Sequence, residues 1–327
     1  MPKPLTATIW HNFFRKVKVE NTIMKKALLF GAGLGASLYL QRKADEKEFI
    51  AFIDNDQSKY GSEFCGLPIL SPTALAELEF DEIIITTQWV AEVKRQLIAE
   101  LGIAEEKVIV PLKRELKPSE PFRDTTTLQF ATQVLQTISA AAVRDNMYIC
   151  VDFGTLLGLV RDQQILPWDD DIDFSIRFGE AEEIAHWLSK TLENSDLPMN
   201  WQLDKQTNAK QEVVGLQLKW PAAENKLLPF ITSFSCRQLT NGQSVHMPSL
   251  GMWYAPGEHF VELQEQVINE QVYWFPVRPE AYLQFLYGDW KTPKQDMRIT
   301  DYANVKAGSF EEFAEAKLKV DTWSESD

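Results

Sequence analysis

The sequence predicts two joined domains, the first of the α/β class with a parallel sheet and the second of the α+β class. Three observations support this prediction. Strand-like and helix-like segments alternate from Lys25 to residue 112, a charged and proline-containing segment follows, and a region of longer helices and irregular strands comes after it. With 327 residues, 45% of them hydrophobic, the chain is long enough for two ordinary cores.

The first predicted domain covers residues 25–112. Its expected strands are KKALLF, FIAFID, DEIIITT and KVIVP, and its expected helices are LYLQRKADE, SPTALAELE and VAEVKRQLIAELG. Strands that alternate with helices in this way form a parallel sheet wrapped by helices. We therefore expect a small Rossmann-like unit of about four strands.

A glycine loop follows the first strand of this domain. Gly31, Gly33 and Ala36 have Gly-x-Gly-x-x-Ala spacing, and Asp54 ends the next strand. Such a loop brings backbone N–H groups and a helix N-terminus to a phosphate, which predicts a nucleotide or sugar-nucleotide site at Gly31, Gly33 and Asp54. Only one half of a dinucleotide fold is present, so a structural or subunit-contact role is the alternative. The stretches FIAFIDND and YGSEFCGLPILSP resemble the N-terminal modules of bacterial enzymes that tailor surface sugars.

The second predicted domain covers residues 125–327, after a linker at residues 113–124. Its expected helices are TTTLQFATQVLQTISAAAVRDNM, a helix starting near Gly154, EAEEIAHWLSK, RPEAYLQFLYGDW and the tail FEEFAEAKLKVDTWSESD. Residues 200–275 have the pattern of strands and loops. Residues 1–24 form a basic N-terminal arm, for which packing or fraying is favoured over contact with a membrane surface.

Composition excludes several classes of function. The net charge of −14 and the pI near 4.9 disfavour a nucleic-acid partner. The three cysteines are widely spaced, which fits reduced structural thiols and a cytoplasmic setting, at most at the inner face of the membrane. No histidine pair has zinc-hydrolase spacing, and no apolar run reaches the ~20 residues of a transmembrane helix.

The stretch ILPWDDDIDFSIR contains the strongest functional signal. As a strand it places Ile172, Phe174 and Ile176 on one face and Asp171 and Asp173 on the other, with Asp169 extending the acidic face and Asp170 pointing away. Carboxylates next to a hydrophobic core repel one another, and a divalent cation removes that conflict. Oxygen ligands favour Mg²⁺ or Mn²⁺. The metal ligands predicted here are Asp171, Asp173 and Asp169.

Three other interpretations of the acidic residues are available. A solvated acidic face does not explain the apolar flanks. An EF-hand loop ending at Glu180 has Phe174 where the turn glycine belongs. The Asp-x-Asp motif of glycosyltransferases remains as an alternative. Upstream, Gly154 and Thr155 follow a strand and begin a helix, an arrangement in which backbone N–H groups hold a phosphate and Arg161 adds positive charge.

FGTLLGLVR followed by ILPWDDDIDFSI closely resembles the LicD/fukutin family of phosphotransferases, with FLYGDWKTP resembling its closing motif. The resemblance covers residues 124–295 and implies a nucleotidyltransferase-like fold. It also implies transfer of phosphocholine, phosphoglycerol or phosphoribitol from a CDP-linked donor to a glycan of a capsule, lipopolysaccharide or teichoic-acid type.

One departure from the family pattern stands out. The family commonly has a further acidic strand, whereas the corresponding stretch here, LLPFITSFSCRQL, has no carboxylate. Asp152, Asp289 and Glu258 are the candidates for the missing group. If none of them supplies it, the alternative function is a non-catalytic sugar-nucleotide-binding protein.

Overall fold

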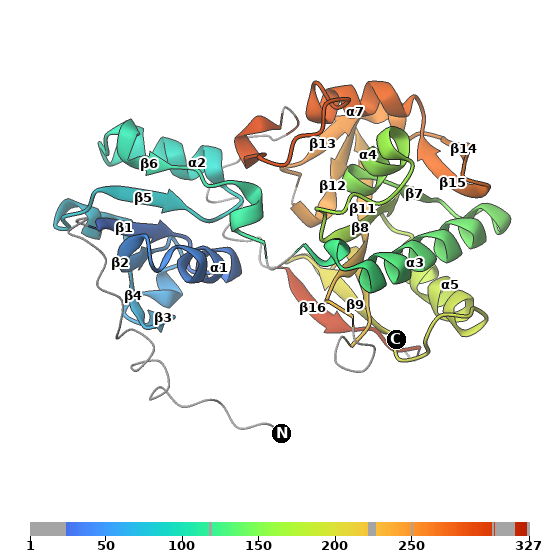
Figure 1. The fold of residues 1–327 in the computed structure, drawn as a ribbon, viewed down its shortest axis with the longest axis horizontal. Coiled ribbons are helices and arrows are strands. Elements are labelled where there is room, and N and C mark those ends of the chain that lie inside the picture. The colour runs from blue at the N-terminus through green and yellow to red at the C-terminus, as the bar shows by residue number, and fades with distance from the viewer. Residues whose placement is uncertain are drawn as a thin grey trace.

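The computed structural model describes residues 24–117, 120–221, 227–249, 251–302, 304 and 318–325 (Figure 1). Almost all of the predicted N-terminal arm lies outside these residues. One sheet precedes the segment 113–124 and a second, larger sheet follows it. Within the described part of the chain, no helix combines the length and apolarity needed to cross a bilayer.

The N-terminal sheet has the strand order β3-β4-β2-β1-β5-β6 and is parallel except where β3 pairs with β4. The bounds are β1 Lys25–Phe30, β2 Lys47–Ile53, β3 Glu63–Phe64, β4 Leu67–Leu70, β5 Glu82–Ile85 and β6 Val108–Ile109. The four predicted strands are β1, β2, β5 and β6. The two short strands come from EFCGLPIL, where a glycine and a proline hide the strand pattern.

Both faces of this sheet are covered. Leu28 and Phe30 of β1 belong to one buried cluster, and Ala27 and Leu29 belong to another on the opposite face. This explains the continuous apolar runs of the central strands, which are typical of parallel sheets. The covering helices are α1 (Leu34–Lys43) and α2 (Val90–Arg95), and α2 continues as a π-helical turn, Gln96–Glu100. The predicted helix at residues 71–79 is a 3₁₀ turn, Pro72–Ala76.

The second sheet has the order β13-β12-β11-β10-β9-β16, with β8 parallel to β11 and β7 antiparallel to β8. The bounds are β7 Ile149–Val151, β8 Asp171–Arg177, β9 Gln202–Thr207, β10 Val213–Lys219, β11 Ile231–Thr240, β12 Gln243–His246, β13 Tyr254–Pro256 and β16 Lys319–Thr322. A separate hairpin joins β14 (Leu263–Ile268) to β15 (Gln271–Pro276).

Within the described ranges, the helices around this sheet are α3 Thr125–Arg144, α4 Phe153–Asp162, α5 Ala181–Glu193 and α7 Pro279–Tyr287 (Figure 1). Helix α3 begins at Asp124, whose carboxylate accepts the Thr127 N–H at 2.8 Å as an N-cap. Helix α7 ends at Gly288, which has a φ of +63° that favours glycine, so the helix is shorter than predicted.

The predicted C-terminal helix is wrong for residues 319–322, which form β16 and pair with β9; residues 310–317 lie outside the described ranges. The adjoining Trp323 is only 6% exposed and belongs to the main core cluster. Burial of this indole and pairing with an existing sheet edge outweigh the helix propensity of the surrounding residues.

Candidate active site

A cavity of about 650 Å³ opens at the amino end of β8, where the segment joining the two sheets meets the second domain. It collects six residues that the sequence singles out: Gly154, Arg161, Asp169, Asp171, Asp173 and Asp289. Its wall also includes Lys113, Arg114 and Lys117, which come from the interdomain segment. The cavity therefore combines the predicted acidic cluster with a basic segment that precedes the second domain.

The turn between β7 and α4 brings backbone to the acidic cluster. Phe153 has a φ of +42°, an uncommon value for a side chain of this size, and Gly154 follows it at the start of α4. A Cβ atom on Gly154 would lie 2.0 Å from Oδ2 of Asp169. Only glycine fits here, because any larger residue would displace the Asp169 carboxylate.

Thr155, unlike Gly154, is not among the residues that line the cavity. Its side chain is buried, and its hydroxyl accepts a hydrogen bond from the Asp173 N–H at 2.9 Å. The hydroxyl therefore fixes the start of β8 relative to α4 and does not line the cavity. A contact between Thr155 and a phosphate remains a prediction for its backbone N–H group only.

Strand β8 confirms the predicted alternation. Ile172, Phe174 and Ile176 are buried, whereas Asp171 and Asp173 are half-buried and line the cavity. Ser175, which follows them on the same face, is fully buried and donates to Asp152. The acidic face of β8 is therefore open to the cavity only at the start of the strand, at Asp171 and Asp173.

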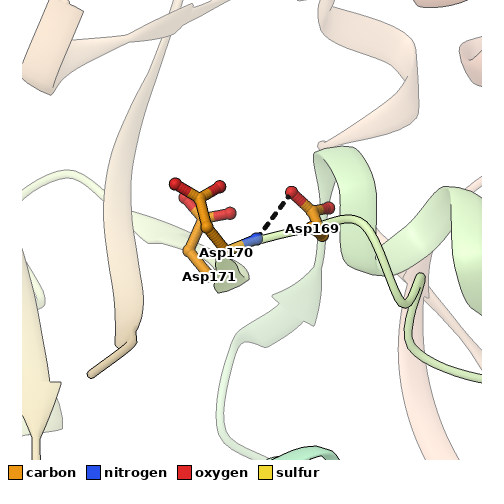
Figure 2. A group of neighbouring side chains, drawn as sticks. All are labelled: Asp169, Asp170 and Asp171. Carbon is orange, nitrogen blue, oxygen red and sulfur yellow. Dashed lines mark hydrogen bonds between the residues drawn. The ribbon is translucent and has the colours of Figure 1, made fainter. Parts of the chain in front are cut away.

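The prediction for Asp170 is wrong. Carboxylate oxygens of Asp169, Asp170 and Asp171 lie within 4.8 Å of one another, and Figure 2 shows the Asp170 and Asp171 carboxylates side by side. Strand β8 begins at Asp171, so the alternation rule does not reach back to the turn that contains Asp169 and Asp170. In that turn Oδ1 of Asp169 accepts the Asp170 N–H at 3.1 Å.

The chemistry of this donor set fits a divalent cation. Burial, together with the nearby Asp169 and Asp170, raises the pKa of Asp171 to about 7. Burial and the neighbouring Asp171 raise the pKa of Asp173 well above its ordinary value. Both carboxylates are therefore held in an environment that disfavours their charge, which is the condition that a hard cation with oxygen ligands relieves.

Asp152 belongs to a buried polar network below the cavity and is no candidate for the missing carboxylate. It is fully buried and accepts hydrogen bonds from Arg237 Nη2 at 2.6 Å, Arg237 Nε at 2.9 Å and the Tyr282 hydroxyl at 2.6 Å. Arg237 is 5% exposed and lies over the ring of Phe260. This ion pair ties the start of α4 to β11 and α7.

Of the other two candidates for the missing carboxylate, Asp289 lines the cavity and Glu258 does not. Glu258 pairs with Arg278 at 2.7 Å, and both side chains are exposed, away from the residues that line the cavity. On the strand next to Asp173, the paired residue is Ser233, so a hydroxyl stands where the family pattern has an acidic strand.

The positive groups come from two places. Arg161 is 8% exposed, binds Asp162 at 2.8 Å and the Trp290 carbonyl at 3.3 Å, and stands over the Trp168 ring. Lys117 donates to Asp170 and lies 3.7 Å from Oδ1 of Asp169. The stretch KRELK has the pattern of a linker, and Lys117 is not among the predicted site residues; the high density of basic residues in that stretch is the available signal.

His246 of β12 is a second cavity residue that is absent from the predicted site. Burial and the nearby Arg237 lower its pKa to about 3, so the ring is neutral at physiological pH. Its ring meets Phe153 edge-on at 5.5 Å. No local sequence signal marks this histidine, because it enters the cavity through sheet pairing.

In the glycine loop of the first domain, Asp54 already has partners within the same domain. Asp54 accepts the Ala32 N–H at 2.8 Å and forms an ion pair with Lys59 at 2.7 Å. Gly31 has a φ of +104°, and a Cβ atom added to it would lie close to Thr87. A Cβ atom added to Gly33 would point into open space. The predicted residues Gly31, Gly33 and Asp54 are brought together, but none of them lines the cavity that holds the aspartates.

Residues 146–278 match the family described as LicD/FKTN/FKRP, nucleotidyltransferase domain. This part of the chain is therefore similar to LicD-type domains. Residues 23–109 match the family described as C2185-like, N-terminal. The LicD-type match contains the aspartate cluster and Gly154, and it indicates a transferase.

Other comparisons add little. No curated protein matches the chain. Among solved structures, UDP-D-quinovosamine 4-dehydrogenase from Vibrio fischeri is 28% identical over 24% of this chain and 74% of its own, with a TM-score of 0.22. A putative oxidoreductase from Bacillus subtilis is 11% identical over 80% of this chain and 84% of its own, with a TM-score of 0.23. Biliverdin reductase from Synechocystis is 11% identical over 82% of this chain and 92% of its own, with a TM-score of 0.24.

Proposed function

We propose that the protein is a metal-dependent phosphotransferase that moves a phosphorylated alcohol from a CDP-linked donor to a hydroxyl group of a cell-surface glycan. The observation that supports this most is that Asp169, Asp171, Asp173 and the start of α4 line one cavity in the region that matches LicD, with the Asp170 carboxylate close to Asp169 and Asp171. Phosphocholine, phosphoglycerol and phosphoribitol are the groups that the family resemblance suggests.

Mg²⁺ or Mn²⁺ held by Asp171, Asp173 and the Asp169–Asp170 turn would supply a Lewis acid that neutralises charge on the transferred phosphoryl group. The N–H groups at the start of α4, next to Gly154, donate hydrogen bonds to a phosphate oxygen. Arg161 stabilises charge on the departing CMP. The chain's own part is therefore to orient the phosphates and to hold positive charge beside them.

The transfer itself exchanges one P–O bond for another. The acceptor hydroxyl attacks the β-phosphorus of the donor, the bond from that phosphorus to the bridging oxygen breaks, and CMP leaves with the electron pair. The hydroxyl proton goes to a base on the cavity wall. Glu120 and Asp289 line the cavity outside the aspartate cluster, and Glu120 pairs with Arg123, so we assign this role to Asp289.

A second function is favoured by one observation. Ser233 stands opposite Asp173 where the family pattern has an acidic strand, so the domain would bind a sugar nucleotide or CDP-alcohol without turning it over. The remaining alternative is a glycosyltransferase with an Asp-x-Asp motif, which would consume a UDP- or GDP-sugar instead of a CDP-alcohol.

One experiment separates these functions. The purified protein is incubated with CDP-glycerol, CDP-ribitol, CDP-choline, a UDP-sugar or a GDP-sugar, with Mg²⁺ or EDTA and with an acceptor glycan, and the released nucleotide is quantified. We expect Mg²⁺-dependent CMP release from one CDP-alcohol. Tight calorimetric binding without release supports the binding protein, and release of UDP or GDP supports the glycosyltransferase.

A further inference from the structure

One ammonium group lies against the acidic cluster. Lys117 pairs with Asp170, and its Nζ lies 3.7 Å from Oδ1 of Asp169. The three side chains are 27%, 19% and 17% exposed. Carboxylates this close together need a counter-charge, and in this structure Lys117 supplies it. The lysine also lines the same cavity as Asp171 and Asp173.

Such a lysine cannot stay in this position once a divalent cation binds the aspartates. A divalent cation bound to the aspartates and the ammonium group of Lys117 carry like charges, so they repel each other and compete for the same carboxylates. The lysine stem is long and flexible, so the ammonium group can turn to another partner in the cavity. The phosphates of a nucleotide donor are the anions that the same cavity would hold.

We propose that Lys117 binds the diphosphate of the nucleoside-diphosphate donor, and that in the absence of metal and donor the same ammonium group holds Asp169 and Asp170. This rests on the function proposed above and adds a donor-binding residue to it. The lysine exchanges carboxylate partners for phosphate oxygens when the site is loaded.

The first domain positions this lysine. Arg42 of α1 donates to the Arg114 carbonyl at 2.6 Å, and Lys43 of α1 lies 3.5 Å from Glu115. A Cβ on Gly35 would lie 3.5 Å from Cβ of Leu116, so α1 packs directly on the segment before Lys117. The N-terminal domain thus has a role in the site that does not require a ligand of its own.

The experiment compares three lysine variants of the full chain. Lys117→Met removes the ammonium group in question. Lys113→Met removes a charge from the same cavity wall; the Lys113 ammonium group lies over the Tyr302 ring at 5.5 Å and feels the aspartates at longer range, whereas Lys117 forms the ion pairs with Asp169 and Asp170. Lys94→Met removes a lysine that pairs with Glu105 at 2.8 Å in the first domain, outside the cavity. Affinity for Mn²⁺ alone, and for CDP at saturating Mn²⁺, is measured by calorimetry.

Opposite shifts are expected for Lys117→Met. Mn²⁺ binds about five- to tenfold more tightly, because its competitor is gone, and CDP binds about tenfold more weakly. Lys113→Met changes Mn²⁺ affinity by about twofold at most, and Lys94→Met changes neither. Arg42→Ala weakens CDP binding in the same direction as Lys117→Met but less, because it acts on the position of the lysine.

Unchanged or weaker Mn²⁺ binding by Lys117→Met, or unchanged CDP binding, overturns the proposal. A purely structural role for the ion pair would weaken both affinities together. Failure of the proposed function looks different: the wild-type protein would release no CMP from any CDP-alcohol, while the opposite shifts in Mn²⁺ and CDP affinity persist.

Discussion

At the scale of single residues, Asp169 and Gly154 define the geometry of the acidic cluster. The carboxylate of Asp169 occupies the space that a Cβ on residue 154 would need, at 2.0 Å. The turn before β8 and the start of α4 are therefore in contact through one glycine. A change at this glycine affects the cluster without touching any carboxylate.

Gly154→Ala is expected to push Asp169 away, weaken Mn²⁺ binding and reduce CMP release by about 100-fold or more, since small displacements in such sites are costly. The measurements are calorimetry with Mn²⁺ and CMP release. Gly33→Ala adds the same methyl group at the N-cap of α1, where nothing lies within 4 Å of the added Cβ, and is expected to leave Mn²⁺ affinity and CMP release unchanged. Wild-type Mn²⁺ affinity in Gly154→Ala would contradict the close contact.

The cysteines give a second prediction at this scale. Cys150 and Cys236 are buried, and burial raises the pKa of the Cys236 thiol to about 12 and that of Cys150 well above its ordinary value. Cys65 is exposed, with a pKa raised by partial burial. A thiol reagent at pH 8 should label one cysteine per native chain, at Cys65, and all three in denaturant. Mass spectrometry that finds native labelling at Cys150 or Cys236 would contradict the fold at β7 or β11.

At the scale of secondary-structure elements, the Asp152–Arg237 pair holds the second domain together. Asp152 follows β7 and caps α4, whereas Arg237 lies on β11, and Tyr282 of α7 joins them. Three elements that are distant in the sequence meet at one fully buried carboxylate. Removing one partner leaves an unpaired buried charge.

Arg237→Met is therefore expected to lower the free energy of unfolding by about 3–5 kcal/mol, measured by urea denaturation at pH 7. The double variant Asp152→Asn/Arg237→Met should recover part of this loss, because no unpaired charge remains. Additive losses in the double variant would show that the two side chains are not coupled.

Local patterning accounts for the elements that the sequence predicted well. The 2.0 period of β8 separated the buried Ile172 and Phe174 from Asp171 and Asp173, and the apolar runs marked β1, β2 and β5. The errors lie where long-range packing decides. The prediction for Asp170 fails because β8 begins at Asp171, so Asp170 lies in the preceding turn, where strand alternation does not apply. The prediction of a helix at β16 fails because the pairing of β16 with β9 has no local sequence signal.

At the scale of the whole molecule, the segment between the domains is part of the candidate site. Lys113, Arg114 and Lys117 line the cavity, and α1 of the first domain holds the segment through Arg42. The sequence identified this stretch as a boundary from its prolines and charges. It gave no sign that the boundary lies against the aspartates, because that contact depends on how the two domains pack.

The most direct test of the central claim is CMP release from the CDP-alcohol panel by the wild-type protein and by Asp171→Asn/Asp173→Asn. Since both changes remove like charges from a crowded site, the melting temperature of the metal-free variant should not fall. We expect Mg²⁺-dependent release by the wild type and a loss of at least about 1,000-fold in the folded double variant. Full release by the double variant would contradict the assignment of the metal and the reaction to this cluster.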